Sequence, residues 1–187
     1  MPPLKEKQLY TYEDYCNWED GDRWELINGE AIVMSPAPLR LHQRTLLKLA
    51  GQFLDLSKNK AFEVNIAPFD VRLNADSHDD TIVQPDLVIV CDSTKLDDRG
   101  CKGVPDMIVE VLSPSSVKHD RFVKLHLYQK AGVCEYWIVD PDSKTVSVYI
   151  LENGKYIAAA YCGEDIVTVR ILQGCKIALS DVFNPFL

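Results

Sequence analysis

The stretch Asp106-Met107-Ile108-Val109-Glu110-Val111-Leu112 decides the fold of this chain. It is a near-continuous apolar run, which is typical of a strand that is covered on both faces in the middle of a sheet. The run from Val83 to Cys91 has the same character. Each run carries one carboxylate in its apolar part: Glu110 in the first, and Asp86, directly after Pro85, in the second. A central sheet with two acidic residues within it is therefore expected.

A carboxylate inside a buried strand needs a partner. Period-two alternation places Glu110 on the same strand face as Ile108 and Leu112. Burying an unpaired ion is costly or shifts its pKa, so one such acid alone is best explained by surrounding backbone N–H groups or by an arginine. Two acids on neighbouring strands favour a second explanation, in which Asp86 and Glu110 share one Mg²⁺, whose hard charge prefers oxygen ligands.

Regular patterns around the two strands indicate an α/β protein. A helical period runs from Leu39 to Leu56, and Ser115 or Ser116 is a candidate N-cap for a second helix that ends at Ala131, before Gly132. The predicted strands are Phe62 to Leu73, Val83 to Cys91, Asp106 to Leu112 and Glu135 to Val139. The whole chain is thus expected to be one α/β unit whose central element order is helix, three strands, helix, strand.

Smaller elements are predicted at both ends of this core. Thr11 is expected to cap a short helix that ends near Glu19-Asp20-Gly21. Asn28-Gly29 is the dipeptide that best fits a type I′ hairpin turn, here between strands Trp24–Ile27 and Glu30–Met34. The predicted C-terminal β additions are Thr145 to Leu151, Tyr156 to Tyr161, and a ribbon that ends in Phe183-Asn184-Pro185-Phe186.

Composition bounds the class of protein. The chain has 187 residues, 47% of them hydrophobic, which fits one globular domain over residues 1–187. No run approaches the roughly 20 apolar residues of a membrane span, and the N-terminus lacks the apolar region of a signal peptide, so a cytoplasmic protein with no membrane partner is expected. The net charge of −8 argues against coating nucleic acid by bulk electrostatics. The six cysteines include no Cys-x-x-Cys pair, and most of them are expected to be buried.

Lys124 lies within the apolar stripe of the second helix. A lysine that points inward there would orient or deprotonate a water molecule, or stabilise a phosphate oxyanion. An i,i+4 salt bridge with Asp120 is an equally good explanation for this residue alone.

Further polar residues are candidates for a supporting role. His42 falls on the apolar stripe of the first long helix, where a histidine is more often a satisfied core residue than a ligand. Glu25 and Glu30 flank the hairpin turn, and strand alternation lets one of them face the sheet. Asp70 shares a strand face with Arg72 and is expected to pair with it.

Five ordered segments resemble the Uma-two family of restriction-endonuclease-like proteins. The resemblance runs from about Tyr10 to Leu151. It rests on Trp24-Glu25-Leu26-Ile27-Asn28-Gly29-Glu30, Ala67-Pro68-Phe69-Asp70-Val71-Arg72-Leu73, Gln84-Pro85-Asp86-Leu87, Ile108-Val109-Glu110-Val111-Leu112-Ser113-Pro114-Ser115, and Ala131-Gly132-Val133-Cys134-Glu135-Tyr136-Trp137-Ile138-Val139-Asp140-Pro141. The family resembles a branch of the PD-(D/E)XK nucleases, whose core has the element order predicted above.

This resemblance implies roles for particular residues. Pro85-Asp86 takes the place of the PD motif, and Glu110 that of the second acid. Leu112 stands where the superfamily has a lysine, and Lys124 from the following helix would substitute for it.

By the same resemblance, Asp86, Glu110 and the carbonyl of Val111 would hold Mg²⁺ or Mn²⁺. Gln84, His42 and Glu25 would form the supporting shell. The implied activity is metal-dependent hydrolysis of phosphodiester bonds in nucleic acid, with DNA as the expected partner. Because the chain is acidic, either a small site or a homodimer that pools Arg and Lys is needed.

Two other functions stay open. A nuclease-like fold that has lost turnover would serve as a nucleic-acid-binding or regulatory module, and Leu112 and the acidic charge favour it. A glycosidase also uses two carboxylates at a set separation, but few aromatic residues stand near either acid to stack a sugar.

Overall fold

The computed structural model describes residues 8–19, 21–34, 38–58, 60–114 and 119–184 of the protein. Its larger sheet contains β3 (Glu63–Ile66), β6 (Leu87–Val90), β9 (Met107–Val111), β10 (Glu135–Asp140), β11 (Thr145–Glu152) and β12 (Lys155–Cys162). Its smaller sheet contains β1 (Trp24–Ile27), β2 (Glu30–Val33), β4 (Asp70–Arg72), β5 (Ile82–Val83), β7 (Leu96–Asp97) and β8 (Gly100–Lys102). The strand orders are β12-β11-β10-β9-β6-β3 and β2-β1-β5-β4-β8-β7.

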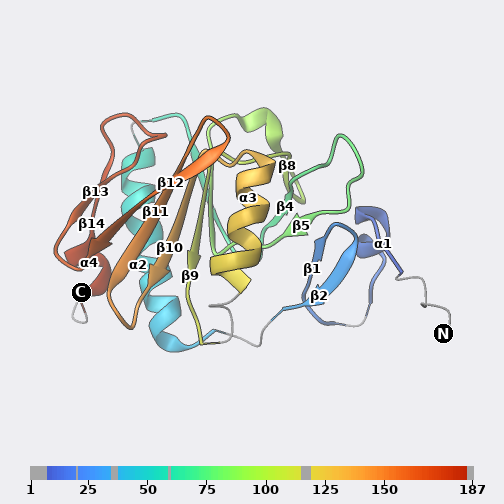
Figure 1. Ribbon diagram of the computed structural model, residues 1–187, viewed down its shortest axis with the longest axis horizontal. Coiled ribbons are helices and arrows are strands. Elements are labelled where there is room, and N and C mark those ends of the chain that lie inside the picture. The colour runs from blue at the N-terminus through green and yellow to red at the C-terminus, as the bar shows by residue number, and fades with distance from the viewer. Residues whose placement is uncertain (1–7, 20, 35–37, 59, 115–118, 185–187) are drawn as a thin grey trace.

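Helical segments pack around these sheets (Figure 1). They are α1 (Tyr12–Cys16), α2 (Arg40–Ser57), the 3-10 turn η1 (Ser93–Lys95), the π-helical η2 (His119–Lys124), α3 (Leu125–Ala131) and α4 (Leu179–Phe183). A short ribbon of β13 (Ile166–Thr168) and β14 (Lys176–Ala178) completes the fold. Among the residues just specified, no helix is long and apolar enough to cross a membrane.

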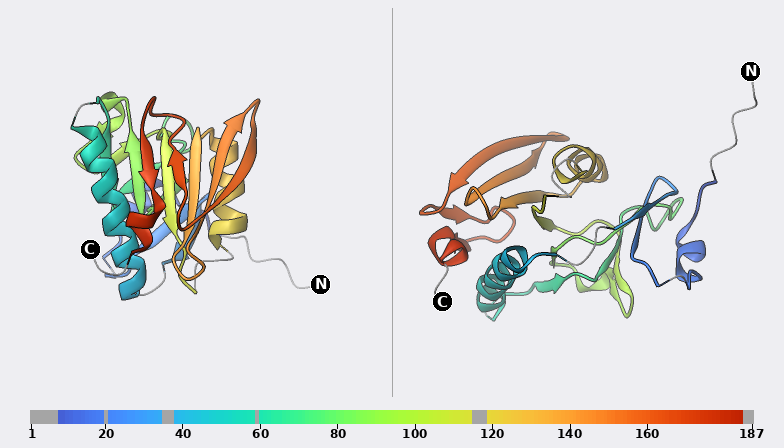
Figure 2. Two further views of the ribbon diagram at one scale, coloured as in Figure 1. Left: turned by 90° about the vertical axis from the view of Figure 1, so that its left-hand side faces the viewer. Right: turned by 90° about the horizontal axis from the view of Figure 1, so that it is seen from below.

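The larger sheet is a central layer with helices on both faces. Figure 2 shows α2 on one face and α3 on the other. One buried cluster joins α2 to the sheet through Phe53 and Val109, and a second joins α3 to the opposite face through Tyr128 and Ile108. The chain order α2, β3, β6, β9, α3, β10 is the helix, three strands, helix, strand predicted for the core. The α/β class and this core order are confirmed.

The predicted N-terminal helix and hairpin are both present. Thr11 caps α1 with a capping box to Asp14, although the helix ends earlier than expected, at Cys16. The hairpin of β1 and β2 turns at Asn28 and Gly29, whose φ angles of 50° and 78° are those of a type I′ turn.

Two strand predictions are wrong in extent. Phe62 to Leu73 forms β3 and β4, which lie in different sheets, and Val83 to Cys91 likewise covers the last residue of β5 and the whole of β6. Both breaks contain a proline, Pro68 or Pro85, which has no N–H group to donate to a ladder. The chain changes sheet at each of these points, so the two crossings tie the sheets together.

The C-terminus differs from the predicted ribbon. β13 and β14 do pair, but they are followed by α4, because Leu179, Val182 and Phe183 recur at helical spacing and all three are buried against the core. The last residues of that prediction, 185–187, lie outside the described part of the chain. So do the candidate caps Ser115 and Ser116, while the predicted helix end holds, with Gly132 in a left-handed conformation.

The cysteine prediction is wrong. Only Cys101 and Cys175 are buried, and the remaining thiols are exposed: Cys16, Cys91, Cys134 and Cys162. The exposed ones stand at or next to the ends of helices and strands, where a small apolar residue has no second layer to cover it.

Gly100 lies where β8 runs beside β4. A Cβ atom at this position would overlap the backbone oxygen of Asp70, and the φ angle of +148° is one that residues with a side chain rarely adopt. Gly100→Ala is therefore expected to lower the free energy of unfolding by at least about 2 kcal/mol, as measured by urea denaturation. Gly51→Ala is the matched control: with open space around its Cβ in α2, it should stabilise by about 0.5–1 kcal/mol. A Gly100→Ala protein as stable as wild type would contradict the close approach of the two strands.

Candidate active site

A pocket of about 340 Å³ opens where the two sheets meet. Its walls come from β1, the crossing from β5 to β6, the end of β9, η2, and the first turns of α2. The structure brings all the predicted site residues to this pocket: Glu25, His42, Gln84, Asp86, Glu110, Val111 and Lys124.

Antiparallel pairing of β6 with β9 brings the two acids together. Leu87 stands opposite Val109 in this ladder. The next step along it sets Asp86 opposite Glu110, so the two acids occupy neighbouring positions at the same end of the sheet. The side chain of Asp86 is 19% exposed and Glu110 is 3% exposed. One acid thus lies at the mouth of the pocket and the other at its buried wall.

Asp86 is held by a histidine and a backbone amide. Its Oδ2 atom lies 3.1 Å from Nε2 of His42 and accepts a hydrogen bond of 2.8 Å from the Val111 N–H group. Burial by itself would lower the pKa of His42, but the hydrogen bond and the charge of Asp86 outweigh it and raise that pKa. His42 is therefore a partner of Asp86 within the pocket and not a core histidine without a polar role.

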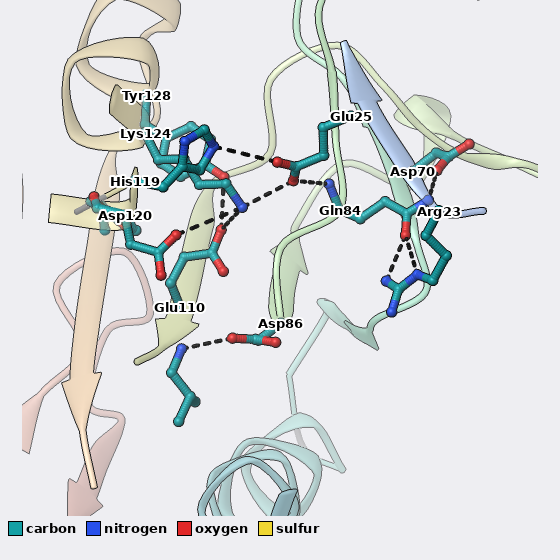
Figure 3. Close-up of polar contacts among 12 residues, drawn as sticks. Arg23, Glu25, Asp70, Gln84, Asp86, Glu110, His119, Asp120, Lys124 and Tyr128 are labelled. Carbon is teal, nitrogen blue, oxygen red and sulfur yellow. Dashed lines mark hydrogen bonds and ion pairs between the residues drawn. The ribbon is translucent and has the colours of Figure 1, made fainter. Parts of the chain in front are cut away.

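Lys124 is the cation at the centre of the pocket (Figure 3). Its Nζ atom lies 2.8 Å from Oε1 of Glu110, 2.9 Å from Oε1 of Glu25 and 3.9 Å from Oδ1 of Asp120. Tyr128 adds a hydrogen bond of 3.0 Å to Oε1 of Glu110. The i,i+4 contact with Asp120 exists, but the shorter contacts reach acids on two different sheets.

The charges in this cluster shift one another's pKa values. Burial raises the pKa of Glu110 well above its usual range against the opposing charge of Lys124, and the nearby carboxylates raise it further. Glu25 shifts the other way: burial tends to raise its pKa, but Lys124, His119 and the Gln84 N–H group together outweigh burial and lower the pKa to about 2. Burial tends to lower the pKa of Lys124, but Glu110 and Glu25 raise it well above its usual range. Lys124 is therefore an ammonium ion at neutral pH.

Gln84 connects this cluster to the smaller sheet. Its backbone N–H donates a 2.9 Å hydrogen bond to Oε1 of Glu25. Its side-chain oxygen accepts hydrogen bonds of 2.6 and 3.1 Å from Arg23. Its side-chain amide donates to Tyr15 and Asp70 at 2.9 Å each. Glu25 is thus positioned by Gln84 so that it faces Lys124.

Each of the two acids keeps one oxygen outside these contacts. The described residues contact Asp86 through Oδ2 and Glu110 through Oε1. Oδ1 of Asp86 and Oε2 of Glu110 are the atoms that suit a divalent cation, which prefers oxygen ligands. Within the described ranges, no group of three or more His, Cys, Asp or Glu side chains is spaced to hold a metal ion. A cation here would complete its shell with a backbone carbonyl and with water, several molecules of which Mg²⁺ usually retains.

Tyr128 and His119, which contact Glu110 and Glu25, were not found from the sequence. Tyr128 follows Lys124 by one helical turn, and this i,i+4 spacing is the signal that would have found it. His119, whose Nε2 lies 3.6 Å from Oε2 of Glu25, has no comparable signal. Its position depends on how η2 packs against β1.

The predicted pair of Asp70 and Arg72 is not the one that forms. Arg72 binds Asp79 instead and stacks over the ring of Tyr12 at 4.0 Å. Asp70 accepts hydrogen bonds from Tyr15 and Gln84. Asp70 finds its partners in α1 and just after β5, and Arg72 finds its partner in the turn that follows β4, so strand-face alternation alone misassigns the pair.

The core order and the acid-lined pocket at the end of the central strands are those of a restriction-endonuclease-like fold. The chain belongs to the Uma2 family, described as "Putative restriction endonuclease", whose model matches residues 10–180. A solved structure with the same fold is a "putative nuclease belonging to DUF820" from Anabaena variabilis ATCC 29413. It is 18% identical, with a TM-score of 0.74 over 93% of this chain and 97% of that one. No curated protein matches the chain.

Proposed function

We propose that the protein is a metal-dependent endonuclease that hydrolyses phosphodiester bonds in DNA. One observation carries this proposal: Asp86 and Glu110 come from adjoining strands into one pocket, where Lys124 contacts Glu110. Membership of the Uma2 family, with its description "Putative restriction endonuclease", supports the reaction class. Mg²⁺ or Mn²⁺ is the proposed cofactor.

The proposed metal ligands are Asp86, Glu110 and the carbonyl of Val111. A divalent cation supplies Lewis acidity that lowers the pKa of a bound water and offsets charge on the phosphate. The protein's own residues provide the geometry around it. His42 and the Val111 N–H group hold Asp86 by one oxygen, which orients the other toward the pocket.

Lys124 is proposed to stabilise charge on the phosphate and to orient the attacking water. Because its pKa is raised well above the usual range, it is protonated and does not act as a general base. Glu25, placed by Gln84, keeps this ammonium group between the two sheets. Proton removal from the water therefore falls to solvent or to a carboxylate in the pocket.

A specific observation favours the alternative of an inactive, binding or regulatory module. Leu112 is buried in the core cluster of Ile108, so the usual lysine position of the superfamily is apolar, and Lys124 is tied to Glu25 as well as to Glu110. The two functions differ in a simple way, because the inactive module would bind a divalent cation or DNA without cutting.

Cleavage itself is the test. Purified protein is incubated with supercoiled plasmid and with single-stranded DNA in Mg²⁺, in Mn²⁺ and in EDTA. The proposal expects nicked and linear products with either metal and none with EDTA. Metal binding without any cleavage in either substrate would favour the inactive module.

Metal binding is expected to stabilise the folded protein. At free Mn²⁺ one hundred times its Kd, linkage predicts about 2.7 kcal/mol of added stability. That corresponds to a rise in Tm of roughly 5–10 °C for a chain of this size, as followed by circular dichroism. The Asp86→Asn, Glu110→Gln double variant is the control and should show no such rise. An equal rise in both proteins would place the metal elsewhere.

A further inference from the structure

In the described part of the chain, β12 is an outer strand of the larger sheet, and most of its residues are exposed. Its pairing with β11 is unbroken, from Glu152 opposite Lys155 to Thr145 opposite Cys162. The residues between Lys155 and Cys162 include no charge and no proline, and Ile157 is 55% exposed. Outer strands commonly carry a lysine, a proline or a bulge that blocks pairing with another chain. β12 has none of these in its centre.

The hydrogen bonds at its two ends show which way the backbone groups of β12 point. The N–H group of Tyr156 donates to Oε1 of Gln129 at 2.8 Å, and that of Cys162 donates to Oδ2 of Asp165 at 2.8 Å. Both partners lie outside β11, so these N–H groups point away from the sheet. Backbone direction alternates along a strand, so Ala158 and Ala160 also present their N–H and C=O groups to the open edge.

We propose that this open edge binds the same edge of a second copy of the chain, with the strands antiparallel and the two-fold axis at Ala159. In this register Ala158 stands opposite Ala160 of the partner subunit. The two-fold axis produces this pair twice, and in each pair the two residues exchange N–H to C=O hydrogen bonds. A register shifted by two residues would set Tyr156 against Ala160 of the partner subunit, or Cys162 against Ala158 of the partner subunit, although the N–H groups of Tyr156 and Cys162 already have acceptors. Because the N–H groups of Tyr156 and Cys162 are already used, only the register centred on Ala159 pairs the exposed backbone groups of both chains.

Side chains and charge agree with this pairing. Ile157 and Tyr161 lie on the same strand face, and each would stand opposite the other residue in the second copy, an apolar cross-strand pair. Lys155 would lie beside Gly163 and Glu164 of the partner subunit, so the charges at the ends of the joined strands are opposite. For a chain of net charge −8, this neutral edge is a place where a second copy approaches without repulsion.

A second copy is a better occupant than an unrelated strand, because the outward-pointing backbone groups of Ala158 and Ala160 are self-complementary under a two-fold rotation. The joined sheets would hold two candidate active sites in one rigid body. This proposal does not depend on the activity of those sites, so its test is the oligomeric state and not DNA cleavage.

The first experiment is light scattering coupled to size-exclusion chromatography at about 100 μM protein, a concentration that populates a dimer of micromolar Kd. Wild type is expected to elute as a dimer. Ala158→Pro removes an N–H group that points to the edge and leaves the β11 ladder intact, so it should raise the dimer Kd at least about tenfold with an unchanged circular dichroism spectrum. Ile157→Lys should do the same. Ile166→Lys is its matched control, since Ile166 is a 62% exposed isoleucine on β13, and it should leave the dimer unchanged.

The second experiment tests the register by disulfide trapping. In a background with the four exposed cysteines replaced by serine, Ala159→Cys should give a covalent dimer with oxidised glutathione, because residue 159 faces its own copy across the axis. Ala160→Cys should trap at least about tenfold less, because each copy of residue 160 faces residue 158. A monomeric wild type, a dimer unaffected by Ala158→Pro, or equal trapping at both positions would each overturn the proposal.

Discussion

Asp86→Asn and Glu110→Gln are each expected to lower the rate of metal-dependent plasmid nicking by about 100- to 1000-fold. Each substitution removes a carboxylate charge from the pair proposed to hold the cation and keeps the side-chain size. The measurement is the initial nicking rate at saturating Mg²⁺ or Mn²⁺.

The matched control for these variants is Glu135→Gln. Glu135 is also buried, and it accepts hydrogen bonds from the Trp137 indole and the Ile171 backbone. It stands opposite Met107 at the start of β9, whereas Glu110 is near the end of that strand. Nicking by Glu135→Gln should stay within about twofold of wild type, because no proposed ligand or contact of the pocket changes. Nicking that persists in both Asp86→Asn and Glu110→Gln would rule out this pair as the metal site.

Lys124→Met is expected to lower the free energy of unfolding by about 3–5 kcal/mol, measured by urea denaturation in EDTA. The ammonium group is the cation that Glu25 and Glu110 share, and both carboxylates are buried. Removing it leaves two buried acids without compensation, which costs more than the hydrogen bonds themselves. Adding Glu25→Gln to Lys124→Met should restore at least about 1 kcal/mol, because it removes one of the uncompensated charges.

Lys48→Met separates this effect from the loss of any partly buried lysine. Lys48 lies on α2 and donates a 2.7 Å hydrogen bond to the backbone oxygen of Asn184. Its replacement should cost only about 0.5–1.5 kcal/mol, the typical range for one such bond. If Lys124→Met were no more costly than Lys48→Met, the central role of Lys124 in the acid cluster would be wrong.

The sequence predicted those helices, strands and turns that are encoded by a few neighbouring residues. Asn28-Gly29 predicted the hairpin, because a type I′ turn needs two left-handed residues and this dipeptide adopts that conformation easily. Apolar runs predicted β6 and β9 as central strands, since residues that point to both faces are buried there. The π-helical form of η2 and the strands β7 and β8 had no such signal, because each depends on its neighbours in space.

The proposed site was predicted in part for a related reason. A carboxylate within a buried strand conflicts with the cost of burying charge, so Glu110 could be singled out from its own strand. The residues that contact Glu110 could not be assigned from the sequence in the same way. Lys124 had Asp120 as an equally good partner by helical spacing, and only the structure shows that the shorter contacts go to Glu110 and Glu25.

The amino-acid sequence by itself determined the helix, three strands, helix, strand order of the core and the presence of two acids in its central strands. These follow from hydrophobic period and from the cost of burying charge, both of which act over a few residues. The tertiary structure alone decided which sheet the chain joins after Pro68 and after Pro85, that Glu25 reaches Lys124 from the smaller sheet, and that Ala158 and Ala160 are exposed on the outer strand β12. Those features depend on which distant segments pack together, and no local preference of the chain encodes that choice.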